Sequence, residues 1–553
     1  MSTEGTVAGQ LLKWSKDDSD RLAYIFRGTQ PGNNRVVFTR YEILQLACCF
    51  AAELHEAGVK KGDVICNTLA NSPERLITDL GLMVAGAVTM NGMVFLADGA
   101  DLAKCLFRGN CVAMVLDPNQ PNNALTILED RIIVRGDNAQ CREAPSLRKV
   151  FFVDCGAGAA RRPWLEQLRQ KEEKFTNTSV RSTDMAFVFT TSGTSGFSKL
   201  VPRTHRQFLI LGGTFYDVME ARDKDLIFND RSFGWLGGSC FTYLAKGTTR
   251  VLIDMTVPPP DALAFAWECV FAEQCAVLIM VPPHISMSLA KPDLWKDKKP
   301  RVRSITTGGM PLSKQHVSSV GTLCDQLVIT YASTEGGFIT KNRITMADKD
   351  NFEDGDNGKS TENYTLKIVN DKGMEIAQTQ VGKSGEVLIK GNQTFEGYLG
   401  TAEADMKEMF TDGWLKTSDI GYYNPQGNIH VVCRKSNAIM HGAYIVYPGW
   451  LEKKLEKCPG VKQVMIVPVP DPTMYQEMCA CIVPADGQQV TEMDLKTFCD
   501  SLFSIDKDAE YKTVPKYYVF FDHFPMQSSG NKPDRKKIFA KALEKLNLTP
   551  SAS

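Results

Sequence analysis

The fold is decided by the stretch Phe187-Val188-Phe189-Thr190-Thr191-Ser192-Gly193-Thr194-Ser195-Gly196-Phe197-Ser198-Lys199. The apolar residues 186–189 predict a buried strand, and residues 190–196 are all Thr, Ser or Gly. Small residues let a backbone close around an anion, and Lys199 adds a positive charge to the hydroxyl and N–H donors. The spacing differs from that of the Walker loop. Taken alone, the stretch fits a phosphate cradle and a solvated Ser/Thr/Gly loop equally well.

The bulk composition is that of a globular protein with more than one domain. A chain of 553 residues is too long for one hydrophobic core, and 43% hydrophobic and 23% charged residues are ordinary values. Lys and Arg number 63 against 64 Asp and Glu, a net charge of −1. Without a basic excess, we expect no nucleic-acid partner.

Cysteine usage and the chain ends suggest a compartment. The sixteen cysteines form no CxxC pair, which favours reduced core residues and an intracellular setting over a zinc site. The uncharged run 80–97 is glycine-interrupted, so we expect a buried helix turning into a strand rather than a transmembrane segment. The first residues show no signal-peptide pattern and the last three are not SKL, so a cytoplasmic location is expected.

Hydrophobic periodicity predicts an α/β fold with a mostly parallel sheet. A capping box at residues 39–42 opens a helix that Gly58 closes. Strands then alternate with helices up to residue 330. From Tyr364 the alternating residues and turn signals predict a small antiparallel β subdomain, and beyond Arg434 a small α+β unit is expected.

Three further motifs are weak when taken singly. Residues 331–335 follow a predicted strand, at the end of the sheet where open α/β folds bind ligands, and Glu335 there suits Mg²⁺. Asp419, within residues 413–421, suits ribose hydroxyls, although a turn aspartate is the simpler interpretation. Lys532 lies in a Ser/Gly/Asn/Pro loop and by base rate is a solvated surface lysine.

The order of these motifs resembles that of the adenylate-forming superfamily of acyl- and aryl-CoA synthetases, beetle luciferases and peptide-synthetase adenylation domains. The pattern (S/T)SG(S/T)TGxPKG matches residues 191–200, YGxTE matches 331–335 and GWxxTGDxG matches 413–421. The hinge arginine matches Arg434 and the late GK motif matches 531–532. The resemblance runs from Thr39 to about Leu546.

The resemblance implies a large N-terminal adenylation domain, residues 1–433, made of parallel-rich αβ-layered sheets and the small β subdomain. A small mobile α+β domain, residues 434–553, would carry Lys532. The implied reaction is that of an AMP-forming acid:CoA ligase that uses ATP, Mg²⁺ and coenzyme A. A carboxylate attacks the α-phosphorus of ATP to give an acyl-adenylate and pyrophosphate, and the CoA thiol then attacks the adenylate.

The resemblance also assigns site residues. Those expected to bind the ATP phosphates are Thr191, Ser192, Gly193, Thr194, Ser195, Gly196 and Lys199. Those expected around adenine and ribose are Gly309, Met310, Pro311, Tyr331, Ala332, Ser333, Asp419 and Arg434. Thr334 and Glu335 would position Mg²⁺, and Lys532 would reach the α-phosphate and carboxylate oxygens. Phe233, Thr307 and Gly308 would line the acid pocket, and Gly442 and Ala443 the CoA tunnel.

Several positions depart from the family pattern. Ser198 and Leu200 replace a proline and a glycine of the phosphate loop, and Ala332 and Ser418 each replace a glycine in the later motifs. In the hinge, Ser436, Met440 and Ala443 replace the usual Asp or Lys, Lys and Gly. Phe233 stands where aryl-CoA ligases and luciferases have a histidine, which favours a fatty or other small carboxylic acid. Ordinary core packing is the alternative role for Phe233.

Three functions remain open at this level. The first is the acid:CoA ligase. The second is adenylation without CoA transfer, which Ser436 and Ala443 suggest. The third is a non-catalytic nucleotide-binding relative, against which the retention of Glu335, Asp419, Arg434 and Lys532 argues.

Overall fold

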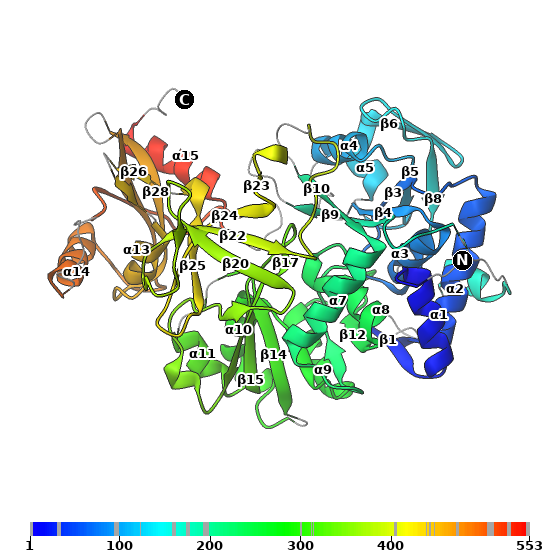
Figure 1. Ribbon diagram of the computed structural model, residues 1–553, viewed down its shortest axis with the longest axis horizontal. Helices are drawn as coiled ribbons and strands as arrows, with labels where there is room; N and C mark the ends of the chain where they lie inside the picture. Colours follow the sequence, from blue (N-terminus) through cyan, green and yellow to red (C-terminus); the bar gives the residue numbers. More distant parts are fainter. Residues whose placement is uncertain are drawn as a thin grey trace. The chain divides into compact units, whose positions relative to one another are not determined.

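A computed structural model describes most of the chain. The residues outside the description are 1–3, 30–34, 93–98, 122, 157–161, 173–176, 178, 192–197, 299–300, 311, 313, 403–405, 438, 442–443, 447, 472–474, 506–513, 528–531 and 549–553. The chain divides into two compact units (Figure 1), one of residues 1–366 and 389–415 and the other of 367–388 and 416–553. The domain boundary expected at residues 433/434 stays a prediction.

The first sheet of the first unit contains the strand that leads into the Ser/Thr/Gly loop. Its order is β10-β9-β4-β3-β5-β8-β7-β6. The strands are β3 (Val64–Asn67), β4 (Val88–Asn91), β5 (Ala113–Leu116), β6 (Ile132–Arg135), β7 (Asn138–Cys141), β8 (Lys149–Phe152), β9 (Met185–Thr191) and β10 (Lys199–Thr204). The central pairs are parallel, while β10 pairs antiparallel with β9, and β6 with β7.

The uncharged run 80–97 folds as expected where it is described. Helix α3 (Pro73–Ala85) is buried along its whole length and is followed by the buried strand β4. The Ser72 side chain caps the helix by accepting from Arg75 N, and Pro73 occupies the first turn. Gly86 ends it with a φ of 86°, a left-handed conformation that favours glycine. No helix in the described part of the chain is long and apolar enough to cross a membrane.

The second sheet has the order β19-β18-β15-β14-β13-β11-β12-β1-β2. Its strands are β1 (Leu22–Arg27), β2 (Arg35–Thr39), β11 (Leu226–Phe228), β12 (Thr249–Ile253), β13 (Val277–Ile279), β14 (Val302–Gly308), β15 (Cys324–Thr330), β18 (Thr340–Thr345) and β19 (Lys359–Ser360). The strands from β1 to β15 in this order run parallel, and antiparallel strands flank them. The α/β prediction is therefore confirmed, although the sequence did not indicate the N-terminal strands β1 and β2.

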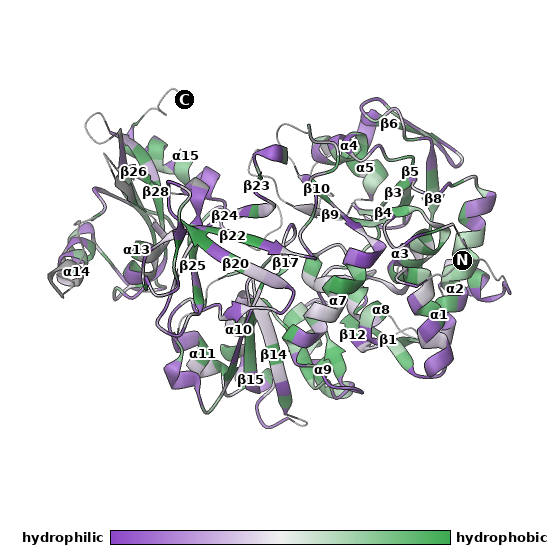
Figure 2. Ribbon diagram, viewed as in Figure 1, coloured by the Kyte–Doolittle hydropathy of each residue, from purple (hydrophilic) through white to green (hydrophobic). Residues whose placement is uncertain are grey.

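Helices bury the faces of these sheets. Helix α7 (His205–Met219) contacts β9 and β10 of the first sheet and β14 and β15 of the second. Helix α9 (Ala262–Ala272) and strand β15 are largely hydrophobic (Figure 2), and their residues share one core cluster. Helix α2 (Arg40–Glu56) packs on α3 and begins with the predicted capping box of Thr39 and Glu42. All sixteen cysteines are free thiols, buried except for Cys433.

From Tyr364 onward the chain forms two antiparallel-rich sheets. One contains β20 (Tyr364–Val369), β21 (Glu375–Ile376), β22 (Gly385–Gly391), β24 (Trp414–Tyr423) and β25 (Ile429–Arg434). In the other, β28 (Val461–Asp471) and β29 (Tyr475–Pro484) form a long antiparallel pair, and β30 (Tyr517–Phe520) adds in parallel. The helices are α13 (Pro448–Leu455), α14 (Glu492–Ile505) and α15 (Arg535–Leu546). These elements match the predicted β subdomain and α+β unit.

Ser418, one of the departures from the family pattern, has a φ of 58° within β24. We expect Ser418→Gly to raise the free energy of unfolding by about 0.5 to 1 kcal/mol. Glycine removes a left-handed backbone cost of about 1 to 2 kcal/mol. Part of this gain is lost because glycine gives the unfolded chain more conformational entropy. Urea unfolding measures the change. Ser418→Ala keeps the Cβ and is the control expected to show no gain, so equal stabilities of the glycine and alanine variants would contradict the prediction.

Candidate active site

The Ser/Thr/Gly loop leaves and re-enters the first sheet at one point. Strand β9 ends at Thr191 and β10 begins at Lys199, and these two residues are register partners. The intervening Ser192, Gly193, Thr194, Ser195 and Gly196 lie outside the described residues. The two strand ends that flank the loop are thus neighbours, with Lys199 the first residue of β10.

Ser198 anchors the end of this loop to helix α4 (Gly99–Arg108). Its N–H donates to Asp101 Oδ1 at 2.9 Å and its hydroxyl donates to Asp101 Oδ2 at 2.7 Å. Arg108 Nη1 donates to the Ser198 carbonyl at 3.3 Å. Where the family pattern restricts the backbone with proline, this chain restrains it with hydrogen bonds.

Lys199 and Glu335 meet through a residue that the sequence did not single out. The Tyr398 hydroxyl donates to Glu335 Oε1 at 2.6 Å. Lys199 Nζ lies 4.7 Å from the centroid of the same tyrosine ring. The structure therefore brings the loop lysine to the ring of Tyr398 and the candidate metal carboxylate to its hydroxyl group.

The candidate adenine residues lie where β14 and β15 end. Gly308 and Thr330 are register partners, so Gly309 and Met310, which follow β14, emerge beside Tyr331, which follows β15. A Cβ on Gly308 would overlap the Thr330 carbonyl, so only glycine allows this approach. Ala332 and Ser333 form the short strand β16, and Ser333 Oγ accepts from Gly336 N at 2.9 Å. Pro311 lies outside the described residues.

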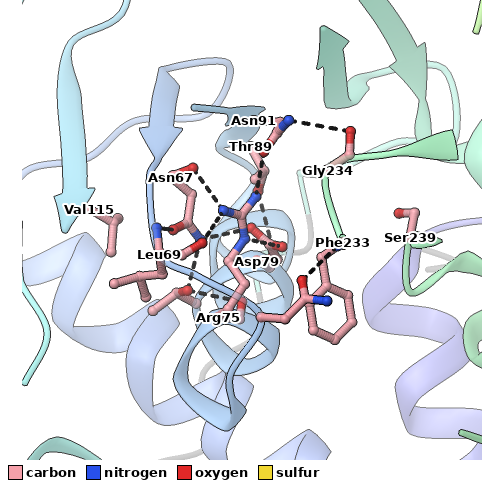
Figure 3. A network of polar contacts seen from close by, with 12 residues as sticks. Asn67, Leu69, Arg75, Asp79, Thr89, Asn91, Val115, Phe233, Gly234 and Ser239 are labelled. Carbon is pink, nitrogen blue, oxygen red and sulfur yellow. Dashed lines mark hydrogen bonds and ion pairs between the residues drawn. The ribbon is translucent and has the colours of Figure 1, made fainter. Parts of the chain in front are cut away.

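The Phe233 segment follows β11 and is fixed by two asparagines (Figure 3). Phe233 N donates to Asn71 Oδ1 at 3.0 Å, and Asn91 Nδ2 donates to the Gly234 carbonyl at 3.3 Å. Asn91 Nδ2 also donates to Thr190 Oγ1 at 3.2 Å, next to the phosphate loop. A Cβ on Gly234 would overlap the Asn91 side chain. The acid-pocket candidate and the loop strand are therefore joined through one amide.

A buried charge network supports Asn91. Arg75 Nη2 donates to Asn91 Oδ1 at 3.3 Å, and Arg75 Nε pairs with Asp79 Oδ2 at 2.8 Å. Figure 3 shows the Arg75 side chain between Asn67 and Asp79. Burial raises the pKa of Asp79, while Arg75 and the Asn67 amide counteract that shift.

Phe233 is itself a packed core residue, 1% exposed, with the Arg250 guanidinium 4.7 Å from its ring centroid. Thr307 and Gly308 lie near the end of β14, separated from β11 only by β13. A cavity lined by Tyr243 and Arg250 gives the centre of a water molecule about 10 Å³ of room. The Tyr243 hydroxyl has no hydrogen-bond partner in the described chain, and one water would satisfy it.

The remaining candidates belong to the second unit. Asp419 and Arg434 are register partners across β24 and β25, with Arg434 Nε 3.0 Å from Asp419 Oδ1. Much of Lys532 is exposed, but crowding of its ammonium group by protein atoms, and then the nearby Arg434, lower its pKa, and Asp419 opposes the shift. Gly442 and Ala443 lie outside the described residues.

The surroundings of Glu335 suit a divalent cation that is held by one protein carboxylate rather than by a complete set of protein ligands. Glu335 Oε1 accepts from Tyr398, and among described residues no hydrogen bond reaches Oε2. The described part of the chain contains no group of three or more His, Cys, Asp or Glu side chains that could hold a metal. A cation bound by Glu335 would take its other ligands from nucleotide and water, as Mg²⁺ commonly does.

Three residues with structural roles at the site were missed from the sequence: Tyr398, Asn91 and Asp101. Each acts through a partner distant in the chain, such as Glu335, which lies 63 residues from Tyr398. A short polar side chain carries no local signal of such a partner. The one available signal was the aromatic residue at 398, which lies between Gly397 and Gly400.

Sequence comparison finds two family matches. The AMP-binding enzyme family matches residues 11–399, and the AMP-binding enzyme C-terminal domain matches residues 451–531. The chain is 24% identical over 506 residues to 4-coumarate–CoA ligase 4 of Arabidopsis thaliana, covering 89% of this chain and 84% of that protein. It is 24% identical over 526 residues to the long-chain-fatty-acid–CoA ligase FadD13 of Mycobacterium tuberculosis strain H37Rv, covering 94% of this chain and 96% of that protein.

Solved structures share the fold. ATP-bound MatB from Rhodopseudomonas palustris aligns with a TM-score of 0.79 at 20% identity, over 98% of this chain and 99% of that one. The o-succinylbenzoate CoA synthetase MenE of Bacillus subtilis, in complex with its acyl-adenylate intermediate, aligns with a TM-score of 0.76 at 18% identity, over 96% and 97%. With the family match spanning more than half of its length, the chain belongs to the AMP-binding enzyme family.

Proposed function

We propose that the protein is an acid:CoA ligase that activates a carboxylic acid with ATP. The first step gives an acyl-adenylate and releases pyrophosphate, and the second gives a thioester with coenzyme A. The observation that carries this proposal is that Lys199, which follows the Ser/Thr/Gly loop at the start of β10, and Glu335 both contact Tyr398. The family membership and the CoA ligases among the relatives support it.

The proposed binding of the ATP phosphates follows from the charge that the reaction develops. Adenylation spreads negative charge over the phosphate oxygens, and preorganised donors stabilise that charge without reorganising. Residues 191–196 would supply hydroxyl and N–H donors, and Lys199 a cation. Glu335, with Thr334, would hold Mg²⁺, which supplies further charge neutralisation when bound. Tyr398 holds the Glu335 carboxylate in place through its 2.6 Å hydrogen bond.

The nucleoside and the α-phosphate would be held by two further groups. Gly309, Met310 and Pro311 with Tyr331, Ala332 and Ser333 would enclose adenine. Asp419 would accept hydrogen bonds from the ribose hydroxyls, with Arg434 fixing its carboxylate at 3.0 Å. Lys532 would approach the α-phosphate and the acid, carried on a mobile domain of residues 434–553 beyond an adenylation domain of residues 1–433.

The acid would lie beside Phe233, Thr307 and Gly308. Phe233 stands where related aryl-CoA ligases and luciferases have a histidine, so the carboxylate would find its charge partner in Lys532 rather than at position 233. This favours fatty or other small carboxylic acids. Gly442 and Ala443 would line the CoA path.

Adenylation without CoA transfer is the second candidate, because Ser436 and Ala443 depart from the family pattern in the hinge. A non-catalytic nucleotide-binding relative is the third. The hydrogen bond between Tyr398 and Glu335, and the Asp419–Arg434 pair, speak against loss of catalysis, since an idle site has no need of aligned charged groups.

Purified protein with ATP, Mg²⁺ and a panel of carboxylic acids of graded chain length is expected to release pyrophosphate, and Lys532→Ala to lower that rate by at least about 100-fold. A coupled pyrophosphate assay measures both. Lys536→Ala, on the exposed first turn of α15, is the matched control and should keep the wild-type rate. Absence of pyrophosphate with every acid would reject the proposal.

Adding coenzyme A separates the first two candidates. Rapid CoA-dependent turnover of the acyl-adenylate, followed by mass spectrometry of the thioester, is the expected result. Accumulation of the AMP ester despite CoA would instead establish adenylation alone.

The lowered pKa of Lys532 sets a pH dependence. A lysine with a lowered pKa loses its proton, and its attraction for phosphate, at a lower pH than an ordinary lysine does. We therefore expect the adenylation rate to fall with rising pH before an unperturbed lysine would titrate. In Lys532→Arg the guanidinium stays charged, so the alkaline decline should move to higher pH. Pyrophosphate release measured from neutral to alkaline pH tests this, and an unchanged profile in Lys532→Arg would contradict it.

A further inference from the structure

Arg203, on strand β10 four residues beyond Lys199, is a cation in the protein core. Its side chain is among the largest that are fully buried, at 1% exposure. Removing a guanidinium from water is costly unless its N–H groups find acceptors. Burial lowers its pKa to about 10, with Tyr364 and Glu335 opposing the shift, so it stays charged at neutral pH.

The guanidinium joins two segments that are distant in sequence. Arg203 Nη2 donates to the Thr334 carbonyl at 2.5 Å and to the Glu335 carbonyl at 3.0 Å. Arg203 Nη1 donates to the Gln393 carbonyl at 2.5 Å. The first segment carries the candidate metal carboxylate, and the second leads within five residues to Tyr398.

The two bridged segments also supply the two partners of one hydrogen bond. The Tyr398 hydroxyl donates to Glu335 Oε1 at 2.6 Å, and Phe395 N donates to the Glu335 carbonyl at 2.9 Å. Gln393 is itself held, because Gln393 Nε2 donates to Thr214 Oγ1 at 2.8 Å. One arginine thus sets the separation of the main chains that carry the acceptor and the donor.

We propose that Arg203 is a positioning residue that aims the Glu335 carboxylate at the nucleotide-bound divalent cation by holding the backbones of residues 334–335 and 393–398 together. The inference rests on the proposed function and adds a residue to its metal-binding machinery. Lys199 lies on the same strand and packs on Tyr398, so the strand β10 ties the phosphate lysine and the metal carboxylate to a common frame. Arg203 touches neither cation nor nucleotide in this role.

The conservative variant distinguishes positioning from charge. Arg203→Lys keeps a buried cation but replaces the planar fork, whose Nη1 and Nη2 each reach one segment, with a single ammonium nitrogen. A purely electrostatic or stabilising role would survive that change better than a geometric one. Arg40→Lys is the matched control. Arg40 is 2% exposed and donates to the Gly247 carbonyl at 2.7 Å, away from the candidate site residues in sequence and contacts.

The experiment measures binding of Mn²⁺, as a probe for Mg²⁺, in the presence of α,β-methylene ATP. Electron paramagnetic resonance of free Mn²⁺ reports the dissociation constant without turnover. Arg203→Lys is expected to weaken Mn²⁺ binding about tenfold, the scale of one charge-assisted hydrogen bond. Arg40→Lys should retain the wild-type constant. Tyr398→Phe should weaken binding similarly, and the Tyr398→Phe and Arg203→Lys double variant should lose less than the product of the two effects.

Wild-type Mn²⁺ affinity in folded Arg203→Lys would overturn the inference, as would strictly multiplicative effects in the double variant. Should Arg203→Lys fail to fold, wild-type affinity in Tyr398→Phe would overturn it, because the hydrogen bond that Arg203 frames would then be irrelevant to the metal. The wild-type protein could bind Mn²⁺ in a nucleotide-dependent manner and yet turn over no acid. That result would reject the proposed ligase activity, but the variants would still decide the role of Arg203.

Discussion

The site depends on the antiparallel pairing of β9 with β10, which makes Thr191 and Lys199 neighbours. A run of Ser, Thr and Gly has little conformational preference of its own, and ordering such a loop costs entropy. The pairing of β9 with β10, at the edge of the eight-stranded sheet, fixes both ends of the loop and so offsets part of that cost. Ser198 extends the restraint with two hydrogen bonds to Asp101, so the loop begins and ends on rigid backbone. Ser198 therefore restrains the backbone by hydrogen bonds at the position where the family pattern has a proline.

Buried polar side chains then carry that rigidity across the first unit. Asn91 reaches Thr190 beside the loop and Gly234 beside the acid-pocket candidate, and Arg75 of helix α3 donates to Asn91. Such networks are costly when half satisfied and rigid when complete. Packing is also tight around these residues, since neither Gly234 nor Gly308 has space for a side chain. Packing and polar bonding thus constrain the same few positions.

Much of the fold could be predicted from sequence because its signals are local. The capping box at Thr39, the buried helix ending at Gly86 and the hairpin turns after Tyr364 each depend on residues a few positions apart. The motif residues Lys199, Glu335, Asp419 and Arg434 were identified by their order. What joins them was beyond sequence reasoning: Arg203 meets Gln393 across 190 residues, and nothing near either residue indicates the other. Ser418 illustrates the same limit, because its cost comes from a φ of 58° rather than from its size.

The division of the chain into units has a consequence for how the protein can be taken apart. Residues 367–388 belong with 416–553, while 389–415 return to the first unit, so the chain passes between the units three times. No single cut yields either unit as one continuous polypeptide, and a fragment that ends at residue 433 retains β24 without Arg434, the register partner of Asp419. Recombination by exchange of C-terminal segments among relatives would therefore replace only part of a structural unit.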